Sequence, residues 1–118
     1  MDIITAAKKN DLSALKVCVK NNENIDMKDH NEMTPLMHAV DNSNKDIVKH
    51  LVELKVNINI QDKYGQTALI LAAGRGNIDI VKILLAANAD KRIKTKHGMT
   101  AFQFASENGK LEVAKLLK

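Results

Sequence analysis

The chain has 118 residues, of which 45% are hydrophobic and 27% are charged, so it is long enough for one folded domain of ordinary globular composition. Its formal net charge of +4 is too mild, and the chain too poor in arginine, to indicate nucleic-acid binding. The single cysteine excludes an internal disulfide, and no apolar run reaches the ~18 residues that a membrane helix needs.

A period of 33 residues organises the chain. Thr34, Thr67 and Thr100 follow one another at this interval of 33 residues, and they open the similar phrases TPLMHAV, TALILAA and TAFQFAS. A constant period of this length is typical of a stacked repeat. The same register extends back to Met1. The chain therefore divides without insertions into four units, 1–29, 30–62, 63–95 and 96–118.

Within each unit, apolar residues recur at helical spacing and predict two short helices of about two to three turns. Helices this short are marginal alone, so neighbouring units must stabilise them. Asp11, Asn44 and Asn77 occupy the same position in successive units and are expected to cap the second helix.

The first unit has the character of a terminal repeat. Thr5, Lys8 and Lys9 make its first helix more polar, as a repeat needs when one of its faces meets water. Cys18 stands where later units have leucine, so we expect a buried, small apolar residue rather than a reactive thiol.

The second unit begins its first helix at Thr34, a natural N-cap that is followed by Pro35 at the first helical position. Glu32 stands where later units have glycine in the preceding turn, and a positive φ there would strain it by about 1 kcal/mol. Ser43 likewise replaces the glycine that ends the first helix. We expect Glu32 and Ser43 to be points of backbone strain.

The third and fourth units keep these glycines. Gly65 and Gly98 lie in the turn, and Gly76 and Gly109 are expected to end the first helix in the left-handed conformation. Lys110 offers no capping side chain, so we expect the last helix to fray most.

This pattern resembles the ankyrin repeat family, whose unit has the same period, a Thr-Pro-Leu-His phrase, a following glycine and paired apolar residues in the second helix. Residues 62–77 match it best, and the resemblance covers the whole chain. It implies an all-α fold, a solenoid of stacked helix-turn-helix units joined by β-hairpin-like turns. It also implies a non-catalytic recognition module that binds a partner protein on its concave face.

The resemblance places partner contacts at the turn tips, along the first helices and at the ends of those helices. We call these positions the palm face: His30, Asn31, Met33, His38, Asp41, Asn42, Lys63, Tyr64, Gln66, Leu71, Arg75, Lys96, His97, Met99, Phe104, Glu107 and Asn108. Tyr64, Leu71 and Phe104 are the expected apolar anchors, while Arg75 and the lysines would attract an acidic partner. The alternative is that the apolar members are packing residues with incidental exposure.

No catalytic arrangement is recognisable in the sequence. The four histidines match no metal-ligand spacing beside Cys18, and the stretch from Gly74 to Gly76 lacks the lysine-serine pair of a phosphate loop. We therefore predict no enzyme activity, no cofactor and no metal. The basic run from Lys91 to His97 is interpreted as a solvated turn, with a seat for an acidic segment or a phosphate-bearing surface as the alternative.

Two functional hypotheses remain open. The chain is either a recognition module, acting as adaptor or inhibitor, or a structural scaffold segment of a longer repeat protein. An engineered stack is disfavoured because Glu32 and Ser43 break the turn glycines that designs idealise. We expect a monomer without nucleic-acid or membrane contacts and a cytoplasmic location, with nuclear location or secretion without a cleaved signal left open.

Overall fold

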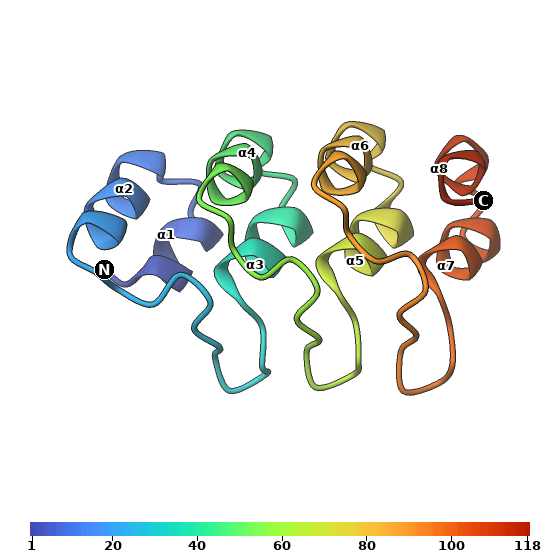
Figure 1. Ribbon diagram of the computed structural model, residues 1–118, viewed down its shortest axis with the longest axis horizontal. Coiled ribbons are helices and arrows are strands. Elements are labelled where there is room, and N and C mark those ends of the chain that lie inside the picture. The colour runs from blue at the N-terminus through green and yellow to red at the C-terminus, as the bar shows by residue number, and fades with distance from the viewer.

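The computed structural model describes residues 1–118, which form eight helices and no strand. The helices are α1 (Ile3–Lys8), α2 (Leu12–Lys20), α3 (Pro35–Asp41), α4 (Lys45–Glu53), α5 (Ala68–Arg75), α6 (Ile78–Ala86), α7 (Ala101–Glu107) and α8 (Leu111–Leu117). Consecutive helices pair, and the pairs stand side by side in a row of 40 × 25 × 21 Å (Figure 1). The predicted all-α solenoid is therefore confirmed, and each of the four units contains one pair.

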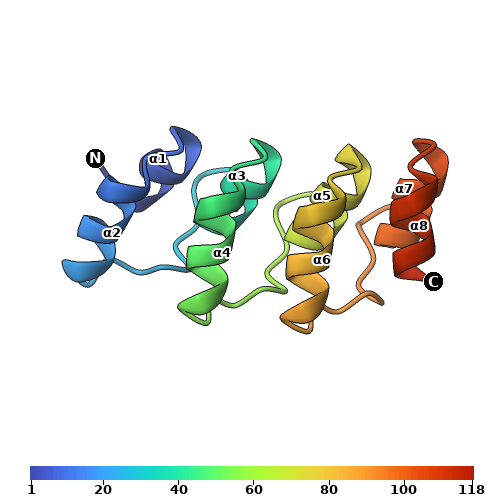
Figure 2. The ribbon, with the colours of Figure 1, turned by 90° about the horizontal axis from the view of Figure 1, so that it is seen from above.

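The helices lie in two layers. The first helices of the pairs, α1, α3, α5 and α7, contact one another along the row, and α4, α6 and α8 do the same in the second layer. Figure 2 shows the same order from above, with every pair in nearly the same orientation. Because each unit contacts only its neighbours, all the stacking interactions are local along the solenoid.

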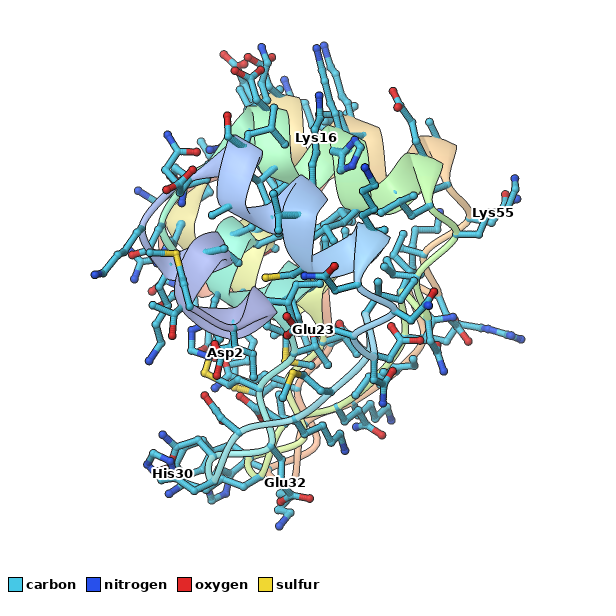
Figure 3. The ribbon with its side chains drawn as sticks, turned by 90° about the vertical axis from the view of Figure 1, so that its left-hand side faces the viewer. Asp2, Lys16, Glu23, His30, Glu32 and Lys55 are labelled. Atoms are coloured by element: carbon cyan, nitrogen blue, oxygen red, sulfur yellow. The ribbon has the colours of Figure 1, made fainter.

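Three β-hairpin-like turns connect the units, at residues 29–33, 62–66 and 95–99. In each turn the backbone N–H of the first residue donates to the carbonyl of the fifth, at 3.0, 2.9 and 2.9 Å. The turns project on the same side of the helices (Figure 1), and the tip residues His30 and Glu32 lie far from the second-layer helices (Figure 3). Further backbone hydrogen bonds join neighbouring turns, from Lys63 N to Asn31 O at 3.2 Å and from Lys96 N to Tyr64 O at 3.1 Å.

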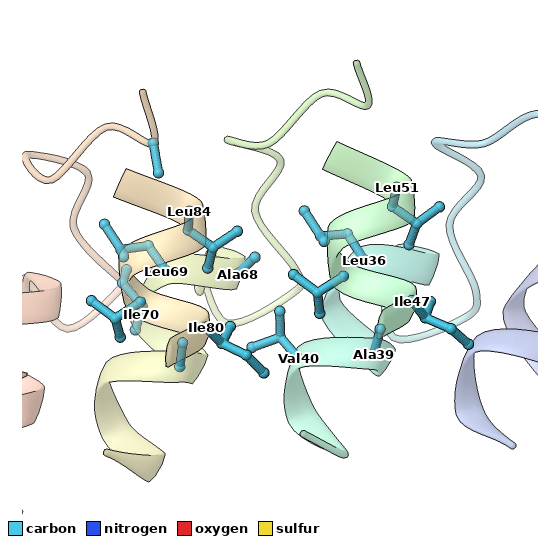
Figure 4. Close-up of a cluster of buried hydrophobic side chains, with 14 of the residues drawn as sticks. Leu36, Ala39, Val40, Ile47, Leu51, Ala68, Leu69, Ile70, Ile80 and Leu84 are labelled. Atoms are coloured by element: carbon cyan, nitrogen blue, oxygen red, sulfur yellow. The ribbon is translucent and has the colours of Figure 1, made fainter. Parts of the chain in front are cut away.

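The hydrophobic core is one continuous strip of 26 buried residues that runs through all four units. Leu69, Ile80 and Leu84 are among its largest fully buried side chains, and alanines such as Ala39 and Ala72 let the helices approach closely. Figure 4 shows Leu69, Ile80 and Leu84 among the side chains that fill the space between neighbouring pairs. A single unit cannot bury this strip alone, so the stack folds through its interfaces.

The expected helix caps are present with one exception. The hydroxyls of Thr34, Thr67 and Thr100 accept the backbone N–H of the third following residue at 3.2, 3.2 and 3.3 Å. Asp11 and Asn77 cap α2 and α6 in the same way.

Asn44 is the exception, and its predicted cap of α4 is wrong. Its Nδ2 donates to the carbonyl of Ala7 at 2.9 Å instead, so the side chain joins the first two units rather than closing its own helix.

Positive φ angles occur at the positions where the sequence predicts strain. Glu32 has φ 62° and Ser43 has φ 56°, values that glycine adopts more easily than other residues. Lys55, at the end of α4, has φ 64° and was not predicted, although Asn22 and Asn88 occupy the same position in the first and third units with φ 63° and 66°. The fold therefore imposes the left-handed conformation on three residues that disfavour it.

Candidate functional site

The palm face is an angled surface, with the first-layer helices on one side and the hairpin turns on the other (Figure 3). Its hairpin part is held rigidly. The first residues of the three turns, Asp29, Asp62 and Thr95, each accept two backbone N–H groups of their own turn through a single side-chain oxygen. These bonds fix the direction in which each turn leaves the helices.

Gly65 shows how closely the turns pack against one another. It has φ 81°, and a Cβ atom added there would lie 2.8 Å from the backbone nitrogen of Lys96 in the next turn. A larger residue would therefore both strain the backbone and separate two turns of the palm face.

One hollow opens on the palm face, between the last two turns and α7. It has a volume of about 300 Å³ and is lined by Tyr64, Gln66, Thr95, His97, Met99 and Phe104. We call these six residues the hairpin hollow. All except Thr95 belong to the predicted palm face, and Thr95 was missed because its side chain has the structural task of anchoring the turn.

Tyr64 is the most prominent apolar group at this hollow. It is 56% exposed, and the ammonium of Lys63 lies 5.1 Å from the centre of its ring, within range of a cation–π interaction. Phe104 and Leu71 are half-buried and pack against the core. Each is therefore in part a packing residue and in part an exposed apolar group that a partner can contact, which were the two alternatives drawn from the sequence.

A family comparison agrees with this geometry. A model described as ankyrin repeats (3 copies) matches residues 3–95 and, in a second match, residues 54–118. The chain belongs to the ankyrin repeat family. Ankyrin repeats are generally protein–protein interaction modules and are typically non-catalytic. In a comparison with curated proteins, none matched the chain.

His38 does not belong to the exposed surface of this ankyrin stack, contrary to the prediction. It is only 7% exposed, and its Nε2 lies 2.7 Å from Oδ2 of Asp29. Burial opposes ionisation of Asp29, but hydrogen bonds from His38 and from the backbone N–H groups of Met33 and Asn31 outweigh it and hold the pKa of Asp29 below its usual value. His38 therefore anchors a turn to α3 and has little surface left for a partner.

The helix-end positions of the palm face are partly engaged with one another. Arg75 and Asp41 form an ion pair across two ankyrin units, with Nη2 and Oδ1 2.9 Å apart. Asn42 donates to the carbonyl of His38 at 3.0 Å, and Asn108 donates to the carbonyl of Gly74 at 3.4 Å. Because Asp41 offsets its charge, Arg75 is a weaker attractant for an acidic partner than the sequence suggests.

The remaining palm-face residues divide by exposure. His30, Lys96, His97 and Glu107 are exposed, whereas Asn31, Met33, Lys63, Gln66 and Met99 are half-buried. The accessible part of the predicted surface is therefore shared between the turn tips and the ends of the first-layer helices, where Asn42, Arg75 and Asn108 are exposed as well.

The basic run from Lys91 to His97 contributes unevenly. Arg92 folds back onto Asp90, with Nε and Oδ1 3.2 Å apart, and its hydrogen bonds lower the pKa of Asp90. Lys91 approaches the carbonyl of Lys118 at 3.4 Å. Lys96 is exposed and has no ion-pair partner, so it remains available to bind a negatively charged group.

Cys18 is buried at 3% exposure, as predicted, and its thiol donates to the carbonyl of Met1 at 3.4 Å. Burial, together with the nearby carboxylate of Glu23, raises the pKa of the thiol. A thiol that resists ionisation is a poor nucleophile, so Cys18 serves as a core residue.

The largest hollow lies elsewhere, between the ends of α4 and α6, and sequence reasoning missed it. It has a volume of about 760 Å³ and includes Val52, Val56, Ile58, Ile83 and Lys55 in its lining. Lys55 lies on the side of the molecule away from His30 (Figure 3). No sequence signal marks this hollow, because it forms between two units and not within a motif.

No group of three or more His, Cys, Asp or Glu side chains is arranged to hold a metal ion. All buried side-chain nitrogen and oxygen atoms have hydrogen-bond partners. None of the helices is both long and apolar enough to cross a bilayer.

Proposed function

We propose that this ankyrin stack is a non-catalytic recognition module that binds a partner protein on the palm face and acts as an adaptor or inhibitor. The observation that carries the proposal is the hairpin hollow, where Tyr64, Met99 and Phe104 present apolar surface between two rigid turns. Exposed aromatic groups beside a pocket are the usual anchors of a protein interface.

The dimensions of the stack suit such a role. A palm face along a molecule 40 Å long could cover roughly 800 Å² of a partner, which is the size of a standard interface. The turn-anchoring hydrogen bonds lower the ordering cost of association, since little of the face has to become fixed on binding.

The test is affinity capture of partners from source-cell lysate with three forms of the chain. Tyr64→Ala and Val17→Ala form a matched pair, because the two side chains are 56% and 57% exposed and Val17 lies on α2, outside the palm face. We expect Tyr64→Ala combined with Phe104→Asp to lose the captured protein while Val17→Ala retains it, with the helical circular dichroism signal unchanged. Retention of the same protein by the Tyr64/Phe104 variant would overturn the palm-face proposal.

A scaffold segment of a longer array is the second candidate function. It is supported by a hollow of about 460 Å³ at the outer side of the last unit, lined in part by Phe102 and Leu117, which another ankyrin unit could cover. Fusing one further consensus unit after Lys118 tests it. A large rise in the melting temperature supports the scaffold role, and an unchanged value argues for a self-sufficient module.

A further inference from the structure

We propose that the hairpin hollow receives one apolar side chain from a linear acidic segment of the partner, while Lys63 and Lys96 bind carboxylates on either side of that side chain. This inference rests on the proposed recognition function and specifies the chemistry of the partner. It follows from the apolar walls, the free polar groups and the charge of the hollow, taken in turn.

The walls of the hollow fit a single side chain. Tyr64, Met99 and Phe104 supply apolar surface from a turn tip, a turn base and a helix, so they face the hollow from different directions. A volume of about 300 Å³ lies at the lower end of the range for small-ligand sites. A leucine-sized or phenylalanine-sized group with its adjacent backbone suits this space, whereas the broad face of a helix does not.

Two polar side chains of the hollow are free to bind the backbone of such a segment. Gln66 and His97 both line it, and their hydrogen bonds within the turn are made by backbone atoms alone, which leaves both side chains free. The amide of Gln66 can both donate and accept, as a peptide bond requires. An extended segment could therefore be held by its main chain on both sides of the anchor.

The charge beside the hollow is positive. The ammonium of Lys63 lies over the ring of Tyr64, and Lys96 lies in the chain between Thr95 and His97. Neither lysine forms an ion pair.

The carboxylates of the first two hairpin turns are already engaged. Asp62 accepts two backbone N–H groups of its own turn, and Glu32 lies 4.0 Å from Lys28. The charges of Lys63 and Lys96 are thus available at the edge of the hairpin hollow. A segment with acidic residues is electrostatically complementary to this edge.

The experiment is a selection from a library of short random peptides displayed on phage, performed with the whole chain. We expect the selected peptides to share one apolar residue with aspartate or glutamate on both sides. Binding of a selected peptide, followed by fluorescence polarisation, should weaken when salt is raised from about 50 to 300 mM. Tyr64→Ala should lower its affinity roughly tenfold or more.

Reversing the charges of the edge gives the sharpest test. A selection with the Lys63→Glu/Lys96→Glu variant should replace the acidic flanking residues by basic ones and keep the apolar residue. The matched control is Lys49→Glu/Lys82→Glu, two exposed lysines of the second-layer helices, which should select the same acidic peptides as the wild type. Melting curves of each variant establish that it is folded.

The outcomes separate this inference from the proposed function. Peptides without acidic flanks would overturn the inference. In that case, Tyr64-dependent binding would leave palm-face recognition standing. A partner captured from lysate regardless of Tyr64 and Phe104 would overturn the proposed function, and with it the inference.

Discussion

His38 and Asp29 are bonded through Nε2 and Oδ2 at 2.7 Å, and this contact holds the first hairpin turn against α3. The two side chains are only 9% and 15% exposed, so solvent screens the interaction little. The bond makes the geometry of the palm face depend on a carboxylate that must stay ionised.

Acid should therefore weaken the fold through Asp29. Its folded pKa is lowered from 3.8, so its stabilising contribution is complete above that pH and is lost as the pH falls through the folded value. We expect Asp29→Asn to reduce the free energy of unfolding by about 1–3 kcal/mol at neutral pH, and this difference from the wild type to shrink below pH 3.8. Urea unfolding over a pH series measures it. Glu53→Gln controls for the loss of one negative charge. A difference in unfolding free energy between the wild type and Asp29→Asn that does not change with pH would exclude ionisation of Asp29 as the cause.

Removing backbone strain should stabilise the protein. Glu32 and Lys55 have φ 62° and 64°, and glycine relieves the left-handed penalty of about 1 kcal/mol per site, less the entropy that glycine adds to the unfolded chain. We expect Glu32→Gly and Lys55→Gly each to raise the melting temperature. Lys49→Gly, at an exposed position inside α4, is the opposite control and should lower it. Unchanged or lower values for the first two variants would show that these turns carry no net strain.

The strain at Glu32 and Ser43 and most of the helix caps were predictable because both depend on residues near in sequence. Thr34, Thr67 and Thr100 bond to the third residue after them, and no distant residue competes. The same reasoning was wrong for Asn44, because its amide donates to the carbonyl of Ala7, which is 37 residues away in the sequence.

His38 was misplaced for a related reason. The repeat register aligns His38 with Leu71 and Phe104, so the sequence suggested that all three face the partner. In the structure Leu71 and Phe104 are half-buried, whereas His38 is buried. Its burial depends on the turn that carries Asp29 folding over it. The hollow too is made by two turns and a helix, so the sequence named most of its residues without showing that they meet.

The core strip should respond to the loss of one buried side chain. Leu69 is 2% exposed between α5 and its neighbours, so Leu69→Ala should leave a cavity and cost about 2–5 kcal/mol in unfolding free energy. Leu116→Ala, at a position 36% exposed on α8, should cost much less. Denaturant titration of both variants makes the comparison, and equal costs would contradict the assignment of Leu69 to the core.

The ion pair between Asp41 and Arg75 should contribute little to stability. Its side chains are 36% and 54% exposed, and exposed pairs are typically worth about 0.2–1 kcal/mol. A double-mutant cycle with Asp41→Ala and Arg75→Ala should give a coupling energy in this range that falls as salt is added. A larger coupling, insensitive to salt, would show that the pair orders the stack.

The last helix should be the least stable part of the solenoid, and one substitution should repair it. Lys110 precedes α8 without a side-chain cap, whereas Asn77 at the same position caps α6 by accepting the backbone N–H of Ile80 at 3.1 Å. Lys110→Asn should add the missing bond and stabilise the chain by about 1 kcal/mol. Amide hydrogen exchange should then slow in α8 more than in α6, because units of a solenoid respond locally and pass stability mainly to their neighbours. Lys110→Ala removes the same charge without providing a cap, and protection equal to that of Lys110→Asn would trace the gain to the lost charge and not to the cap.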